Sequence, residues 1–266
     1  MPETRAQPEP GHEGLPEYVG GAYFDRHRDR HGDDAGFKTA QFLKLFGPLA
    51  AEHGWRIRAY ADVGCGCGFE TRAVLQGLRR LGHSVSQAWG YDVHPAVDSI
   101  PSETGLRFVH GDFTATTEVV DLVTLFDVFE HIPDPLGFLR AVAERCRYLG
   151  LHVPLDNNLN HSLRDRYRSK LRDPGHLVFL DACQALSLLS CAGMRVVEYA
   201  YTPGFRVPSG RRSRLARLAR IPRSLIWWFS PWLLSKTLGG VSLLILAETS
   251  KGWSRGSSPG TDGSLR

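Results

Sequence analysis

The stretch AYADVGCGCGFE at residues 59–70 constrains this chain more than any other. It contains a short apolar run, then glycines at every second position (Gly64, Gly66 and Gly68), then the start of a helical segment. A loop of this kind after a strand lets backbone N–H groups and a helix N-terminus approach a nucleotide-like ligand with no Cβ in the way. The pattern therefore predicts an α/β domain with a nucleotide-type site at the end of its first strand.

This loop differs from a dinucleotide-binding turn at one position. The G-x-G-x-x-G/A pattern requires a third small residue, and the chain has Phe69 there. A nicotinamide-dependent oxidoreductase is therefore disfavoured and stays as an alternative. Asp62 lies inside the apolar run, where an unpaired carboxylate would be costly, so we expect it to bind the loop amides or the ammonium group of a ligand.

Apolar strands alternate with amphipathic segments through most of the chain. This alternation predicts a mostly parallel sheet covered by helices on both faces. After a polar loop at 156–175, the pattern indicates a helix, a stop at Gly193 and a strand, with which a final strand at 240–249 is expected to pair antiparallel. The other expected elements are strands at 58–63, 87–92, 106–112, 119–128 and 149–155, and helices at 36–53, 69–82 and 135–148.

The composition is that of one globular domain with appendages, with 42% hydrophobic and 23% charged residues among 266. Five cysteines without a C-x-x-C pair indicate a reducing, cytoplasmic setting. We expect flexible tails at 1–17 and 251–266, a core at 18–205 completed by a last strand within 239–250, and an insertion at 206–238.

Two acids stand where a nucleoside would need them. Asp92 follows Gly68 by 24 residues at the end of the second strand, close to the spacing at which a carboxylate binds ribose hydroxyls. Its alternative role is to cap a turn. Asp112, at the end of the third strand, is interpreted as the acceptor for an adenine amino group, with Phe113 packed against the ring. A helix cap is the alternative for Asp112.

Four motifs in order along the chain, DVGCGCG, GYDVHP, HGDF and FDVFEHIPDP, resemble those of class I S-adenosylmethionine (SAM)-dependent methyltransferases. Further segments, among them GLHVPLDNN, GHLVFL, EYAYTPG and LGGVSLLILAE, are similar to a bacterial subgroup associated with surface-glycan and secondary-metabolite gene sets. The resemblance spans about 18–249. It implies a seven-stranded, doubly wound Rossmann-like sheet with a reversed terminal hairpin, and SAM as the cofactor.

The resemblance also implies the roles of individual residues. The glycines would form the loop at the methionine end of SAM, Asp92 would hold the ribose, and Asp112 the adenine. Lys38, on the helix before the sheet, is interpreted as part of a solvated helix face, with the cofactor carboxylate as its alternative partner. The complete predicted cofactor site comprises Asp62, Gly64, Cys65, Gly66, Gly68, Asp92, Val93, Asp112, Phe113 and Asp127.

The predicted catalytic residues are Asp127, Glu130 and His131. They follow the fourth strand, at the edge where open parallel sheets bind ligands. Methyl transfer to a hydroxyl or amine requires loss of a proton, and an imidazole titrates near neutral pH, so His131 is the candidate general base. A histidine that only holds the loop is its alternative. His152, Asp156 and His176 are further candidates for this cleft, with structural roles as the alternative.

The Asp-x-x-Glu-His run can also present two carboxylates and an imidazole to one divalent ion. The Glu130–His131 pair matches one that quinone-type O-methyltransferases of this fold use near a metal. This chain has Asp127 where those relatives usually carry Glu. We therefore assign no metal ligand and keep the ion as an alternative.

The insertion at 206–238 combines seven arginines between Arg206 and Arg223 with the apolar stretch SLIWWFSPWLL and contains no acid. Basic residues beside Trp, Leu and Phe are typical of interfacial helices, and the apolar stretch is too short to cross a bilayer. Peripheral contact with the inner membrane face, or reception of a lipid-linked acceptor, is one interpretation, and a helical lid is the other. Nucleic acid is ranked last, because the apolar block does not suit a solvated groove.

The predicted function is direct methyl transfer from SAM to an oxygen of a small-molecule, sugar or lipid-linked glycan acceptor. An N-methyltransferase and a non-catalytic SAM-binding protein are the alternatives. The pattern carries no information on the acceptor's identity or the oligomeric state, since acceptor pockets are built from loops that no motif encodes.

Overall fold

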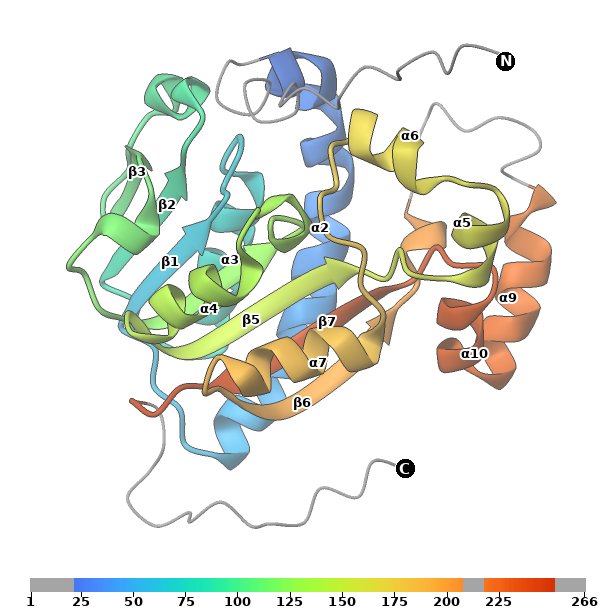
Figure 1. The fold of residues 1–266 in the computed structure, drawn as a ribbon. Helices are drawn as coiled ribbons and strands as arrows, with labels where there is room; N and C mark the ends of the chain where they lie inside the picture. The colour runs from blue at the N-terminus through green and yellow to red at the C-terminus, as the bar shows by residue number, and fades with distance from the viewer. Residues whose placement is uncertain (1–21, 208–217, 252–266) are drawn as a thin grey trace.

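The computed structural model describes residues 22–207 and 218–251, with side chains from residue 34 onward (Figure 1). The predicted tail at 1–17, all but the first residue of the predicted tail at 251–266, and part of the predicted insertion lie outside the described residues.

A seven-stranded sheet in the order β3-β2-β1-β4-β5-β7-β6 forms the centre of the fold. Its strands run parallel except β7, which pairs antiparallel with both β5 and β6. The predicted mostly parallel sheet with a terminal antiparallel hairpin is confirmed. The strands are β1 (Ala59–Val63), β2 (Gln87–Asp92), β3 (Leu106–His110), β4 (Val120–Phe126), β5 (Cys146–Pro154), β6 (Arg195–Thr202) and β7 (Ser242–Glu248).

Helices cover both faces of this sheet (Figure 1). On one face, Phe42 and Phe46 of α2 pack with Tyr60 and Leu122 of the sheet. On the other, α4 and α7 bury their apolar sides. No helix within 22–207 and 218–251 combines the length and apolar character needed to cross a membrane. The helices are α2 (Ala22–Glu52), α3 (Phe69–Arg80), α4 (Pro135–Ala143), α5 (Leu159–Leu163), α6 (Tyr167–Arg172), α7 (Ala182–Cys191), α9 (Arg220–Phe229) and α10 (Pro231–Lys236), and the single 3-10 turns are η1 (Pro95–Ser99), η2 (Phe113–Ala115), η3 (Phe129–His131) and η4 (Gly204–Arg206).

Three predicted elements differ from the structure. The helix expected at 135–148 ends at Ala143, because Cys146 already pairs with Val120 in the sheet and is fully buried there. The loop expected at 156–175 contains α5 and α6, and the side chain of Asn158 caps α5 by accepting the N–H of His161 at 3.0 Å. The first helix begins at Ala22, well before the predicted start at residue 36.

The register of the central strands assembles the site. In the parallel pairs β1–β4 and β4–β5, Asp62 lies beside Thr124 and Phe126 beside His152. The carboxyl ends of β1, β4 and β5 therefore meet at one edge, next to the point where the strand order reverses between β1 and β4. α2 crosses this region, and its Phe42 packs edge-on against Phe126 with ring centroids 5.6 Å apart.

The contact between α2 and the sheet depends on Gly150 at the centre of β5. A Cβ at this position would lie 2.6 Å from Cε2 of Phe42, whose side chain is fully buried. We expect Gly150→Ala to lower the free energy of unfolding by about 1–3 kcal/mol through overpacking, as measured by urea denaturation. Gly36→Ala is the matched control, because a Cβ there meets nothing within 4 Å and the residue lies in α2. Equal stability of the two variants would contradict the packing argument.

Candidate active site

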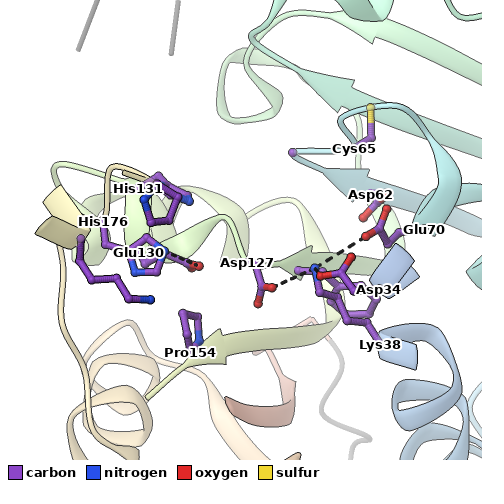
Figure 2. Close-up of a pocket in the computed structure, with 14 residues that line it drawn as sticks. Asp34, Lys38, Asp62, Cys65, Glu70, Asp127, Glu130, His131, Pro154 and His176 are labelled. Atoms are coloured by element: carbon purple, nitrogen blue, oxygen red, sulfur yellow. Dashed lines mark ion pairs between the residues drawn. The ribbon is translucent and has the colours of Figure 1, made fainter. Parts of the chain in front are cut away.

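A cavity of about 260 Å³ opens at the carboxyl ends of β1, β4 and β5, beneath α2. Figure 2 shows that charged side chains face one another across it, with Asp127 near the middle. The lining residues are Asp34, Lys38, Asp62, Gly64, Cys65, Glu70, Phe126, Asp127, Glu130, His131, Pro154, Lys170, Pro174 and His176.

The glycine loop between β1 and α3 forms one wall. Gly64, Gly66 and Gly68 all have positive φ, at 77°, 51° and 75°, a conformation that other residues adopt at a cost. A Cβ on Gly64 would also collide with the side chain of Val128, and one on Gly68 would lie 2.5 Å from the ring of Phe108. The loop is therefore closely packed, and its backbone conformation requires the glycines.

Asp62 is buried beneath the loop, and its partners within the described residues are hydroxyls, not the loop amides that the sequence predicts. Its carboxylate accepts hydrogen bonds from the hydroxyls of Thr71 (2.6 Å) and Thr124 (2.7 Å), and its contact with a ligand ammonium stays a prediction. The reason is the register, which places Thr124 of β4 beside it. Burial raises the pKa of Asp62 to about 6, with the two hydroxyls opposing the change.

Asp92 joins the loop to the end of β2. Its carboxylate accepts the N–H of Gly66 at 2.8 Å and that of His94 at 2.9 Å. Val93 follows with half of its surface exposed (51%). Asp92 thus lies against the glycine loop, as its predicted role requires, although neither residue lines the cavity itself.

Asp112 caps η2, which was the alternative for this residue. Its carboxylate accepts hydrogen bonds from the backbone N–H of Thr114 at 2.7 Å and from the hydroxyl of the same residue at 2.8 Å. The ring of Phe113 is 1% exposed and packs edge-on against Tyr91 in the core. In this structure that ring offers no face to an adenine, contrary to the prediction, because η2 turns it inward.

Lys38 connects α2 to the sheet edge and is not on a solvated helix face. The residue is only 6% exposed. Its ammonium nitrogen lies 2.9 Å from a carboxylate oxygen of Asp127, 3.0 Å from one of Asp34 and 3.7 Å from one of Glu70 (Figure 2). We call these four residues the Lys38 cluster. Burial disfavours the Lys38 ammonium, but the three carboxylates outweigh it and raise its pKa above the usual range. Burial raises the pKa of Glu70 to about 8, and Lys38 opposes this.

Asp127 is held from two sides and has a positive φ of 56°. Besides Lys38, its carboxylate contacts Nδ1 of His152 at 2.7 Å, and Nε2 of that ring lies 3.0 Å from the hydroxyl of Thr202. Burial opposes ionisation of Asp127, but Lys38 and His152 outweigh it and hold its pKa far below the usual range. An anion stabilised in this way accepts protons poorly, so the geometry favours a positioning role for Asp127.

The opposite side of the cavity carries the histidine cluster, Glu130, His131, Asp156 and His176. Nδ1 of His176 lies 2.7 Å from Asp156, and its Nε2 lies 3.8 Å from Oε1 of Glu130. The rings of His131 and His176 meet edge-on with centroids 5.0 Å apart. Nδ1 of His131 lies 3.0 Å from the carbonyl oxygen of Gly175. Thus two of the three histidine and acid positions considered from the sequence, Asp156 and His176, belong here.

Glu130 is the most buried acid of this cluster. It is 2% exposed, and its Oε2 makes no hydrogen bond within the described parts of the chain. Burial, reinforced by the charge of Asp127, raises its pKa well above the usual range. By contrast, His176 and Lys170 lower the pKa of Asp156 to about 2 despite its burial.

Three members of the histidine cluster could also hold a metal ion. Glu130, His131 and His176 each offer a ligand atom, and these atoms lie within 4.8 Å of one another. Asp127 does not belong to this set, and its carboxylate is paired with Lys38 and His152. The structure thus brings His176, and not Asp127, together with Glu130 and His131, and the metal alternative stays a prediction.

Six cavity residues were missed from the sequence: Asp34, Glu70, Phe126, Pro154, Lys170 and Pro174. Asp34 and Lys38 are spaced i, i+4 on α2, which was a usable signal for an ion pair but not for its burial. Lys170 and Pro174 lie in the segment expected to be a loop, and only the tertiary structure brings it to the sheet edge.

Residues 40–202, more than half of the chain, match the family model described as a methyltransferase domain. The chain belongs to this family. It is a class I SAM-dependent methyltransferase, and its cofactor is SAM. The recognition made from the four motifs is confirmed at this level, and the bacterial subgroup stays a prediction. No curated protein sequence matches the chain.

Solved methyltransferase structures share the fold. Magnesium protoporphyrin IX methyltransferase from Synechocystis PCC 6803, with bound SAH, is 15% identical, with a TM-score of 0.54 over 89% of this chain and 98% of that one. A protein assigned as a sarcosine dimethylglycine methyltransferase from Galdieria sulphuraria is 16% identical, with a TM-score of 0.54 over 80% and 85%. A protein assigned as a methyltransferase, in complex with the Trm112 methyltransferase activator of Haloferax volcanii, is 15% identical, with a TM-score of 0.52 over 88% of this chain and 97% of that one. These identities establish a common fold alone.

The buried Asp62 generates a prediction on pH and stability. The pKa of its carboxyl rises from 3.8 to about 6 on folding, so the folded protein binds this proton more tightly than the unfolded chain does. The resulting stabilisation is complete below about pH 4 and is lost as the pH rises through about 6, a difference of about 3 kcal/mol. We expect Asp62→Asn to remove this fall from urea unfolding curves of the ligand-free protein measured between pH 4 and 7.

The exposed substitution Glu118→Gln is the control and should follow the wild-type pH dependence. If Asp62→Asn kept the wild-type slope, the carboxyl would have to be ionised throughout this range.

Proposed function

We propose that this methyltransferase transfers the methyl group of SAM to a hydroxyl oxygen of a small-molecule, sugar or lipid-linked glycan acceptor, with His131 as general base. The observation that carries the proposal is the arrangement of the cavity, which has the glycine loop and the Lys38 cluster at one side and His131 at the other.

The residues on the side of the glycine loop and the Lys38 cluster match the positive charge of SAM. Asp34, Asp62, Glu70 and Asp127 outnumber the one cation, Lys38, and burial raises the pKa of both Asp62 and Glu70. A cationic ligand favours the ionised form of such carboxyls, and SAM carries a sulfonium and an ammonium group. We assign this acidic side to the methionine end of SAM.

Asp92 and the exposed Val93 would hold the nucleoside end. Each carboxylate oxygen of Asp92 accepts one backbone N–H and has a further lone pair for a ribose hydroxyl. Asp112 would accept a hydrogen bond from the adenine amino group through the carboxylate lone pairs that the η2 cap does not use. When bound, SAM supplies an electrophilic methyl carbon on a sulfonium leaving group.

His131 is suited to take the acceptor proton. Its Nδ1–H donates to the carbonyl of Gly175, which places the ring's lone pair on Nε2. Burial raises the pKa of Glu130 well above the usual range and so disfavours its anionic form. Asp156 orients His176, whose ring packs edge-on against His131 and holds its plane. Proton removal and alignment are thus the chemical contributions of these residues.

The acceptor class is tested with methyl-tritiated SAM and a panel of monosaccharides, nucleotide sugars, polyprenyl-phosphate sugars, phenols and primary amines. We expect label to pass to a hydroxyl compound, with a mass gain of one methylene located on oxygen. Transfer confined to amines would replace O-methylation by N-methylation at the same cavity.

For the panel compound that accepts label, we expect His131→Ala to lower kcat by about 10²- to 10⁴-fold, the usual contribution of a general base. The dissociation constant of SAM, measured by calorimetry, should stay within about threefold, since His131 faces the acceptor side. His53→Ala, at an exposed position in the turn after α2, is the control and should keep full turnover. Unchanged turnover of His131→Ala would remove the histidine from the mechanism.

A metal-assisted version of the same transfer is the second candidate. The ligand geometry of Glu130, His131 and His176 and the unsatisfied buried Oε2 of Glu130 favour it. A divalent ion there would stabilise a deprotonated acceptor hydroxyl without a separate base.

Removal of metal ions with a chelator distinguishes the two candidate mechanisms. With His131 as base, we expect turnover after EDTA treatment and desalting to stay within twofold of the untreated enzyme. Loss of turnover that Mg²⁺ or Mn²⁺ restores, together with at least tenfold weaker Mn²⁺ binding in His176→Gln, would establish the metal-assisted route instead.

A further inference from the structure

α9 carries an exposed apolar stripe that packing does not account for. On this helix, Ile221, Leu225, Trp228 and Phe229 are 61%, 60%, 79% and 75% exposed, and Leu218, two residues before its start, is 62% exposed. Steps of four and three residues keep the side chains of Ile221, Leu225 and Trp228 on one side of the helix. Large apolar groups on a soluble surface are usually scattered singly, so a continuous stripe indicates a contact surface.

The opposite side of α9 is also apolar and faces the protein. Ile226 and Trp227 pack against the core, and the ring of Trp227 meets Phe205 at a centroid distance of 6.1 Å. Arg223 anchors the helix by donating to the carbonyls of Leu238 (3.1 Å) and Gly239 (3.2 Å). α9 is therefore fixed on the fold by one side and presents the stripe with the other.

α10 and α5 extend this surface. On α10, Trp232 and Leu233 are 54% and 44% exposed, while Leu234 is fully buried and holds the helix in place. On α5, Leu159 and Leu163 are 53% and 76% exposed. Figure 1 shows α5 beside α9 and α10, and the N–H of Asn160 donates to the carbonyl of Thr237 at 2.9 Å. Two segments far apart in the sequence thus bring exposed apolar residues to the same region of the fold.

Arginines surround the apolar surface. Residues 218–247 contain no Asp or Glu, and the α5–α6 segment adds exposed arginines at 164, 166, 168 and 172 against the acids Asp165 and Asp173. Arg166 and Arg164 lie near enough to Arg223 for their charges, after burial, to lower its pKa. Lys236 is neutralised by Asp181 at 2.8 Å. The arginines around the stripe therefore leave an unbalanced positive charge.

We propose that the exposed faces of α9 and α10, together with α5 and α6, form a docking surface for the headgroup region of an anionic lipid bilayer. Tryptophans and leucines enter the boundary between headgroups and acyl chains, and arginines bind lipid phosphates. An anionic bilayer matches both the apolar side chains and the positive charge of this surface. A second copy of the chain would bring two sets of arginines together, which opposes association.

The surface adjoins the cavity. α6 carries Lys170, and the residues that follow it, Pro174 and His176, line the same cavity. A chain docked on lipid would therefore hold the acceptor side of its active site near the membrane plane. Docking itself does not depend on the proposed O-methylation, because vesicle binding is measured without an acceptor.

The test is flotation of the full-length protein on a sucrose gradient with vesicles of phosphatidylcholine alone or mixed equally with phosphatidylglycerol. We expect flotation with the anionic vesicles, at least tenfold more bound protein than with phosphatidylcholine alone, and a decrease in 0.5 M NaCl. Absence of flotation with either vesicle would overturn the proposal.

Variants assign the binding to this surface. Trp228→Ser/Phe229→Ser/Trp232→Ser should lower the bound fraction at least tenfold, and Arg164→Gln/Arg166→Gln should lower it on anionic vesicles. The control Val119→Ser/Tyr199→Ser removes apolar groups exposed elsewhere, 52% and 39%, and should float as wild type.

Unchanged flotation of the triple variant would overturn the proposal. The proposal would also be overturned if neither protein floated and sedimentation velocity showed a dimer for the wild type but not for the triple variant. Calorimetry with SAM on every variant verifies that the active-site fold is intact. If the wild-type protein floated but did not bind SAM, the result would count against the methyltransferase site and not against the docking surface.

Discussion

The active site depends on the ion pairs of Lys38 with Asp127, Asp34 and Glu70. Lys38 comes from α2, outside the sheet, and its partners come from the end of β4, from α2 itself and from the first turn of α3. Breaking such a buried cluster leaves uncompensated charges, which costs far more than an exposed pair. The cluster therefore holds α2 over the cavity and keeps Asp127 in its left-handed conformation.

The charges of the cavity divide its chemistry between two sides. Lys38 and His152 favour the ionised form of Asp127, and burial favours the protonated form of Glu130, so the pKa values of two acids in one loop are shifted in opposite directions. Such a difference is how one site provides both a fixed anion and a proton-holding group. A ligand with cationic groups fits the Lys38 cluster, and a hydroxyl that must lose its proton fits the side of His131.

Local patterns predicted the sheet, the glycine loop and the position of Asp92, because strand periodicity and positive-φ glycines are properties of neighbouring residues. They failed where contacts between distant segments decide. Asp62 pairs with Thr124 through the β1–β4 register, Phe113 turns into the core against Tyr91, and α5 and α6 fold where a polar loop was expected. Lys38 looked solvated because no sequence pattern shows that α3 and β4 bring acids to it.

The sequence by itself determined the family and the cofactor, since both follow from short motifs whose residues are close together in the chain. The tertiary structure alone decided the make-up of the histidine cluster and the direction in which the pKa values of its acids are shifted. His176 lies 45 residues beyond His131, and the pKa values of Glu130 and Asp156 depend on burial and on neighbours from other segments. Burial and long-range electrostatics arise only when the chain is folded, so no local pattern encodes them.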